Sequence, residues 1–174
     1  MQSYKQLYRW IIFLLIPPIA ACGGKSDGGV EFESGNSPGI AIPKAVRTAT
    51  IDADGITYAI LYCDGNDHAM TIANDIATGT CSDLSTETQH TITIEFRFTP
   101  TSSPNQSYPL ATATKENVSV TSGNTSLSFQ EADYDTSFDS DGDQISNVDE
   151  VRNNTDPGDS GCVLGHSFIG HCTL

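Results

Sequence analysis

The sequence predicts a mostly β protein, in which a small sandwich of two sheets is followed by an acidic loop and a short helix. The clearest strand is residues 91–98, where isoleucine or phenylalanine at every second position alternates with polar residues. This period of two is typical of a strand with one buried face and one solvated face. Residues 56–63 are apolar on both faces, as in the central strand of a sheet.

Weaker strands are expected at residues 46–51, 70–72, 118–120 and 127–129, with turns marked by glycine, proline and asparagine between them. Six or seven short strands within residues 45–131 predict a β-sandwich of the immunoglobulin or fibronectin type. The tryptophan that such domains bury on their third strand is missing, because Trp10 is the single tryptophan of the chain. The strand topology therefore stays open.

Residues 1–21 are expected to be a signal peptide. Lys5 and Arg9 precede an apolar run at residues 10–16, which two prolines interrupt, so the run is too short to span a bilayer.

The residues Ile19-Ala20-Ala21-Cys22 resemble a bacterial lipobox. The resemblance implies that Cys22 is acylated and becomes the new N-terminus. Glycine after the cysteine, in place of aspartate, implies sorting to the outer membrane of a Gram-negative bacterium, facing either the periplasm or the surface. The alternative is an ordinary signal peptide in which Cys22 is an accidental thiol.

Residues 22–44 are rich in glycine, serine, proline and charge, which is typical of a flexible tether. The alternative is that residues 40–42 form a first edge strand. Without residues 1–21 the chain has 6 basic and 22 acidic residues, a net charge of −16. Such a charge argues against nucleic acid as a partner and is compatible with cation binding.

The acidic segment, residues 132–160, has the spacing of a calcium loop. Asp139, Asp141 and Asp143 occupy the first, third and fifth places of a twelve-residue loop, and Glu150 occupies the twelfth. The Ile145 carbonyl would be the seventh-place ligand, and Asn147, in the ninth place, would bind directly or through water. We expect Ca²⁺, which takes six to eight oxygen ligands; the alternative is a solvated acidic linker.

The run DSDGDQISNVDEVRNNTDP resembles the aspartate-rich calcium repeats of the thrombospondin type 3 kind. The resemblance implies the ligands Asp139, Asp141, Asp143, Ile145 and Glu150. Two departures are apparent. Gln144 replaces a glycine that commonly has positive φ, at a cost of about 1–2 kcal/mol, and the repeat occurs in one full copy, with Asp133 and Asp135 as a possible decayed neighbour.

A two-turn helix is expected at residues 147–153. Ser146 is a plausible N-cap with Asp149 three places on, and Pro157 and Gly158 prevent continuation.

Besides Cys22 the chain has four cysteines, and an exported protein favours disulfides. Of the three possible pairings we expect Cys63–Cys81 and Cys162–Cys172, because each pair lies within one local segment. The second pair would close the tail, residues 161–174. The alternative for that tail is a zinc or copper site, formed by Cys162, His166, His171 and Cys172.

No enzyme signature is present in the sequence. Asp64, Asp67 and His68 could be drawn as an acid–base set but fit a polar turn better, and His68 and His90 are expected at the surface. We expect a non-enzymatic, lipid-anchored envelope protein with a role in interaction or structure. The alternatives are a calcium-dependent adhesin module for a carbohydrate or protein ligand, and a small hydrolase.

Overall fold

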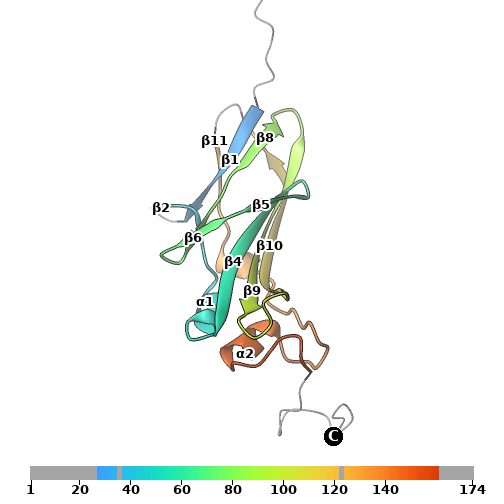
Figure 1. The fold of residues 1–174 in the computed structure, drawn as a ribbon. Coiled ribbons are helices and arrows are strands. Elements are labelled where there is room, and N and C mark those ends of the chain that lie inside the picture. Colours follow the sequence, from blue (N-terminus) through green and yellow to red (C-terminus); the bar gives the residue numbers. More distant parts are fainter. Residues whose placement is uncertain (1–26, 35–36, 122–123, 161–174) are drawn as a thin grey trace, which may run out of the picture.

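The fold is a β-sandwich with two short helices at one end (Figure 1). The computed structural model describes residues 27–34, 37–121 and 124–160. The predicted class, a mostly β sandwich with a short helix, is confirmed.

One sheet has four antiparallel strands in the order β10-β9-β4-β5. The strands span Gly55–Cys63 (β4), Asn66–Ala69 (β5), Gln89–Pro100 (β9) and Tyr108–Ser119 (β10). The predicted strand at residues 91–98 lies within β9, and every second residue of β9 is buried, from His90 to Pro100. The strand predicted as central, residues 56–63, lies within β4, between β9 and β5.

Two smaller sheets cover the inner face of this sheet. In the first, β1 (Asp27–Ser34) pairs antiparallel with β8 (Cys81–Ser85) and β2 (Ser37–Pro38), and parallel with β11 (Asn124–Leu127). The second has the order β3-β7-β6, formed by Ile40–Ala41, Ile76–Thr78 and Thr71–Ala73. The hydrophobic core lies between the layers and contains Leu61, Ile94 and Phe96 from the large sheet with Ile40, Ala77, Cys81 and Leu84 from the smaller ones.

The segment expected to be a tether contains the strands β1, β2 and β3, so that expectation is wrong for these residues. The alternative, an edge strand at residues 40–42, is closer to what forms: β3 comprises Ile40–Ala41, and Ile40 is buried. The signal for β1 was present in the sequence, because Val30 and Phe32 alternate with Glu31 and Glu33.

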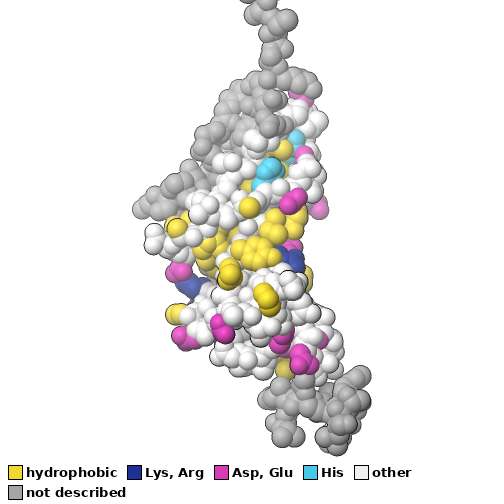
Figure 2. Space-filling view, in the orientation of Figure 1, with side chains coloured by type: hydrophobic (Ala, Val, Ile, Leu, Met, Phe, Trp, Pro, Cys, Tyr) yellow, Lys and Arg dark blue, Asp and Glu magenta, His cyan; other side chains and the backbone are white. Residues whose placement is uncertain are grey.

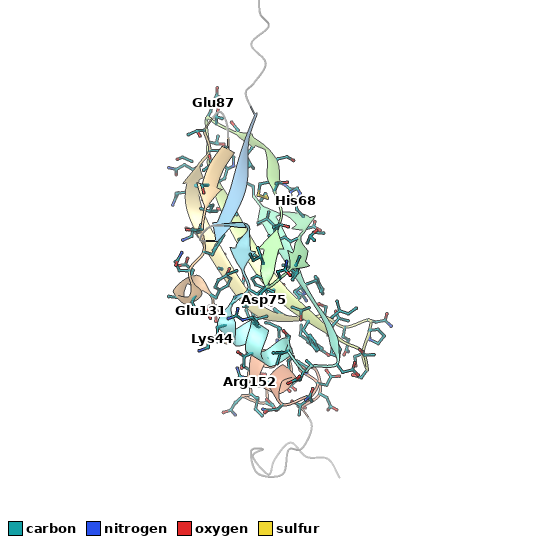
Figure 3. All side chains as sticks on the ribbon, turned by 90° about the vertical axis from the view of Figure 1, so that its left-hand side faces the viewer. Lys44, His68, Asp75, Glu87, Glu131 and Arg152 are labelled. Carbon is teal, nitrogen blue, oxygen red and sulfur yellow. A yellow bond between two sulfur atoms is a disulfide. The ribbon has the colours of Figure 1, made fainter. Side chains whose placement is uncertain are left out.

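Residues 46–51, expected as a strand, lie mainly in a helix, α1 (Lys44–Thr50). Val46 and Ala49 are three residues apart and bury one face of it. The carboxylate of Glu131 accepts hydrogen bonds from the Lys44 backbone N–H at 2.9 and 3.0 Å, which supplies the acceptor that the preceding Pro43 lacks. Figure 3 shows Glu131 beside Lys44 at this end of the molecule.

Strand β10 is much longer than the expected strand at residues 118–120. Its pairing with β9 shifts register twice, between Pro109 and Ala111 and between Lys115 and Val118. Such bulges interrupt the period of two by which a strand is recognised. The other weak strands are displaced by a few residues: Met70 lies between β5 and β6, and β11 ends at Leu127.

The expected disulfide Cys63–Cys81 is formed, with its Cα atoms 5.9 Å apart. It links the last residue of β4 to the first residue of β8, and so joins the two layers.

Candidate metal site

The acidic loop folds around its own aspartates. Asp139 accepts hydrogen bonds from the backbone N–H groups of Gly142 at 2.8 Å and Gln144 at 2.9 Å. One oxygen of Asp141 accepts from the Asp143 N–H at 3.0 Å, and one oxygen of Asp143 accepts from the Ile145 N–H at 2.7 Å. These side-chain-to-backbone bonds hold the loop in a tight turn.

The turn brings three carboxylates together. Ligand oxygens of Asp139, Asp141 and Asp143 all lie within 4.8 Å of one another, so the cluster could hold a metal ion. Like charges this close repel one another, and none of the lysines or arginines described by the structure forms an ion pair with any of the three.

Glu150 adds a fourth carboxylate from the helix that follows, α2 (Asn147–Arg152). It is 2% exposed, and within the described part of the chain its Oε2 has no hydrogen-bond partner. Burial is the largest cause that raises the pKa of Glu150 to about 8, and the charges of Asp141, Asp143 and Asp139 add to it. Glu150 is therefore near enough to the aspartates for their charges to act on it, although the group of carboxylates that lie within 4.8 Å of one another contains only Asp139, Asp141 and Asp143.

Asp141 shows the same lack of compensation. Its Oδ2 is buried and also lacks a hydrogen-bond partner among the described residues, and burial raises the pKa of this carboxyl. A buried carboxylate oxygen without a donor is costly. These two buried oxygens, together with the cluster of Asp139, Asp141 and Asp143, are compatible with a site that could hold a cation.

Two loop residues have positive φ. Gly142 has φ +81° and Gln144 has φ +76°. The positive φ expected at the place where Gln144 replaces glycine is therefore confirmed. A side chain in this region costs about 1–2 kcal/mol relative to glycine, so the loop is strained at Gln144.

The start of α2 is also as predicted. Ser146 is the N-cap, its Oγ accepts from the Asp149 N–H at 3.2 Å, and its hydroxyl donates to the Asp149 carboxylate at 2.9 Å. Asp149 also forms an ion pair with Arg152. Its carboxylate is thus committed to the helix rather than to the cluster.

Asn147, expected as a ninth-place ligand, has a different role. Its Oδ1 accepts from the Ser140 N–H at 2.9 Å, and its Nδ2 donates to the Pro109 carbonyl and to Ser140 Oγ, both at 2.8 Å. Its backbone N–H donates to the Phe138 carbonyl at 2.7 Å. The side chain is fully buried, and these bonds fasten the loop to β10.

The segment expected to be a separate calcium tail is packed onto the sandwich. Asp135 and Thr112 exchange backbone hydrogen bonds of 2.8 and 3.0 Å, and the Tyr134 ring lies 5.9 Å from that of Phe96. Val148 and Val151 of α2 belong to the common hydrophobic core. The boundary expected between residues 131 and 132 is therefore not a boundary between independent units.

Asp133 and Asp135, considered a decayed second repeat, make local contacts. Asp133 accepts from the Gln130 N–H at 2.8 Å and pairs with Lys115 at 3.0 Å. Asp135 accepts from the N–H and the hydroxyl of Ser137.

A cavity of about 250 Å³ lies at the seam between α2 and the sandwich. The turn before β4 contributes Asp54, the end of β9 contributes Phe98 and Pro100, and the end of α2 and the loop after it contribute Val151, Thr155 and Asp156. The cavity is lined by apolar side chains together with carboxylate and hydroxyl groups.

The histidine expectation is corrected at His90, which is buried rather than at the surface. The His90 ring forms a hydrogen bond with the Asp64 carboxylate. The other histidine, His68, is half-exposed. The signal was available, because His90 lies two residues before Ile92 and therefore on the buried face of the same strand.

The remaining predicted site residues lie outside the described residues. They are Cys22, Cys162, His166, His171 and Cys172.

The chain matches no family model, and comparison with curated proteins and with solved structures finds no significant match. Among the residues that the structure describes, no helix has the length and apolar character needed to cross a membrane. Figure 2 shows acidic side chains around the end of the molecule that carries the two helices.

Replacing Asn147 tests its role as an anchor. Asn147→Ala leaves the Pro109 carbonyl and the Ser140 groups without partners, each at about 1–3 kcal/mol. We expect the free energy of unfolding, measured by denaturant titration in chelator, to fall by about 2–4 kcal/mol. Asn153→Ala, at an exposed neighbouring amide, is the control. Equal stability of the two variants in chelator, combined with weaker metal binding by Asn147→Ala, would make Asn147 a ligand instead.

Proposed function

We propose that this chain is a non-enzymatic, lipid-anchored protein of the bacterial outer membrane, whose acidic loop binds one Ca²⁺ ion and fixes one end of the sandwich. Its role would be in interaction or structure. Two observations carry the proposal: the clustered carboxylates of Asp139, Asp141 and Asp143, and a buried Glu150 oxygen that has no hydrogen-bond partner among the described residues and whose carboxyl pKa is raised by those aspartates.

The donor set supports calcium among the metals. The residues that would hold the ion are Asp139, Asp141, Asp143 and Glu150 through carboxylate oxygens, with the Ile145 carbonyl completing the set implied by the repeat resemblance. Oxygen-only sites of this kind suit Ca²⁺, Mg²⁺ or Mn²⁺ rather than zinc or copper. The loop spacing and the number of protein ligands favour Ca²⁺, since Mg²⁺ keeps several of its waters.

The ion would supply positive charge where four carboxylates converge. It would bring the charge of Glu150 into balance without moving that side chain out of the core, and it would link the loop to α2. Because α2 packs on α1 and β10, ordering the loop would also order this end of the sandwich.

A second candidate function is calcium-dependent binding of a carbohydrate or protein ligand. The cavity at the seam favours it, because one wall comes from residues 151–156, directly after Glu150. At about 250 Å³ the cavity is slightly smaller than sites for drug-sized ligands, which are roughly 300–1,000 Å³. Chelation that abolishes ligand binding without unfolding the sandwich would favour this candidate over a purely structural role.

Calcium binding itself is tested by isothermal titration calorimetry. We expect one site with a dissociation constant on the order of 10⁻⁴–10⁻³ M, because Gln144 strains the loop. Asp141→Ala and Glu150→Gln should each abolish the binding heat, since each removes a carboxylate charge from the cluster. Asp159→Asn, an exposed acid outside the set, should leave it unchanged. A wild-type protein that gives no heat at millimolar calcium contradicts the proposal.

Gln144→Gly should tighten the site. Glycine occupies φ +76° without the cost of about 1–2 kcal/mol that a side chain adds. We expect the calcium-bound loop to keep the positive φ at residue 144. Calcium affinity should then rise by up to about tenfold for each 1.4 kcal/mol of strain that the glycine removes. Ser140→Gly would lower affinity or leave it unchanged and serves as the control. If Gln144→Gly binds calcium more weakly, the positive φ belongs only to the ion-free loop.

The anchor is tested at Cys22. The lipobox resemblance implies that Cys22→Ser abolishes acylation and moves the protein from the membrane fraction to the soluble fraction. Labelling with a fatty acid and fractionation of cells measure both effects, and Cys22 would bind the membrane through acyl chains at about 0.8 kcal/mol per buried methylene. An unlabelled, soluble wild-type protein would refute the anchor and leave the calcium site untouched.

A further inference from the structure

His90 lies at the opposite end of the sandwich from the acidic loop, and its imidazole is 4% exposed. Its Nδ1 is 2.7 Å from a carboxylate oxygen of Asp64, and its Nε2 is 2.7 Å from the backbone carbonyl oxygen of Ser85. An ionised carboxylate and a carbonyl can only accept hydrogen bonds. With Asp64 ionised, both short contacts are hydrogen bonds only when both ring nitrogens donate, as they do in the imidazolium form. The Thr88 hydroxyl, 3.4 Å from Nε2, can either donate or accept.

These bonds join three separate elements. Asp64 and Gly65 form the two-residue turn between β4 and β5, with φ +50° and +84°, as in a tight hairpin turn. Ser85 is the last residue of β8, and His90 is on β9. Asp64 is itself held to β9, because its other carboxylate oxygen accepts from the Thr91 N–H at 2.8 Å and its own N–H donates to the Thr91 carbonyl at 2.9 Å.

The disulfide Cys63–Cys81 lies beside this arrangement. It ties the first residue of β8 to β4, immediately before the Asp64 turn. The last residue of β8 is tied to the same turn through His90. A covalent bond that does not respond to pH thus holds one end of this strand, and a proton-dependent bond holds the other.

A cavity of about 470 Å³ lies against the ring, lined among others by Asp64, His68, Ser85, Thr88 and His90. Residues 86–88, between β8 and β9, are exposed. Asp64 from the hairpin turn and His68 from β5 are the titratable side chains that line this cavity with His90, and Glu87 lies exposed in the loop. Figure 2 shows histidine side chains in this half of the molecule, and Figure 3 places His68 below the Glu87 loop.

We propose that His90 is a pH-dependent clamp, which as imidazolium holds the end of β8 to the Asp64 turn and on losing its proton releases the Ser85 carbonyl, so that loop 86–88 opens over the adjacent cavity. A neutral imidazole would direct a lone pair at one of the two oxygens 2.7 Å away. That contact is repulsive, and we expect the Ser85 side to give way, because Asp64 is fixed by two bonds to Thr91, whereas Ser85 is at the end of β8, opposite Asp27 of β1.

The direction of the pH effect follows from the two partners. The hydrogen bond that His90 donates to Asp64 is the largest cause that raises the pKa of His90, and the bond to the Ser85 carbonyl adds to it. The clamp is therefore complete below about pH 6.5, the ordinary value for histidine, and is lost as the pH rises through the raised value. The bond to His90 lowers the pKa of Asp64, so its contribution is present above about pH 4 and is lost on further acidification.

The test combines NMR and hydrogen exchange on the purified full chain with its disulfide intact. In the wild-type protein, ¹⁵N shifts should show both His90 ring nitrogens protonated at about pH 6, with a midpoint above the ordinary value of about 6.5. Protection of the amides at residues 84–88 should fall as the pH rises to about 9, by about tenfold for each unit of raised pKa. In His90→Gln, protection of these amides should not change with pH across this range. In His68→Gln, a change in the same cavity, it should depend on pH as in the wild-type protein.

Two results would overturn the clamp. One is a His90 midpoint at or below about 6.5, which needs only the wild-type protein and so does not depend on whether the variant folds. The other is a pH profile of residues 84–88 that His68→Gln abolishes and His90→Gln preserves, which would assign the effect to the other histidine.

Discussion

The buried amide of Asn147 is the interaction on which the acidic end of the molecule depends. It bonds to Ser140 within the loop and to the Pro109 carbonyl on β10, and its backbone N–H closes the loop at Phe138. The loop can therefore neither shift along the sheet nor unwind without breaking bonds that have no water to replace them. The carboxylates of the loop are held close together by this anchor, against their mutual repulsion.

Packing of α2 on the core imposes a second constraint. It buries apolar side chains, which is favourable, and also the Glu150 carboxylate, which is unfavourable. Asn147, Val148, Glu150 and Val151 form the buried face of this helix, whereas Arg152 is exposed. The face that places Val148 and Val151 in the core necessarily turns Glu150 inward as well, because these positions lie on one side of a 3.6-residue turn. Apolar burial thus stabilises the arrangement that charge burial opposes. A bound cation would reduce this conflict, which is the physical basis for proposing one.

The features that sequence reasoning predicted correctly are local ones. The alternation in β9, the clustering of Asp139, Asp141 and Asp143, the Ser146 cap and the positive φ of Gln144 each depend on neighbouring residues. The failures depend on distant partners. Helix α1 begins on the carboxylate of Glu131, 87 residues away in sequence; the long strand β10 is concealed by two bulges; and Asn147 resembles a ligand until the Pro109 carbonyl is placed next to it. His90 is an exception, because the alternation of β9 already places it on the buried face; only its partner Asp64, from a different strand connection, depends on the fold.

If the protein is anchored through its N-terminus, as proposed, the parallel pairing of β1 with β11 would have a mechanical consequence. Tension arriving at Asp27 acts along β1, and β1 is bonded along its length to β8 on one side and to β11 on the other. Bonds perpendicular to the pull are loaded together, in shear, rather than opened one at a time as in a hairpin peeled from its end. In Figure 1 the chain enters β1 at the end of the sandwich opposite α2. A membrane anchor at Cys22 would therefore place the acidic loop at the end of the sandwich farther from the anchored end of β1.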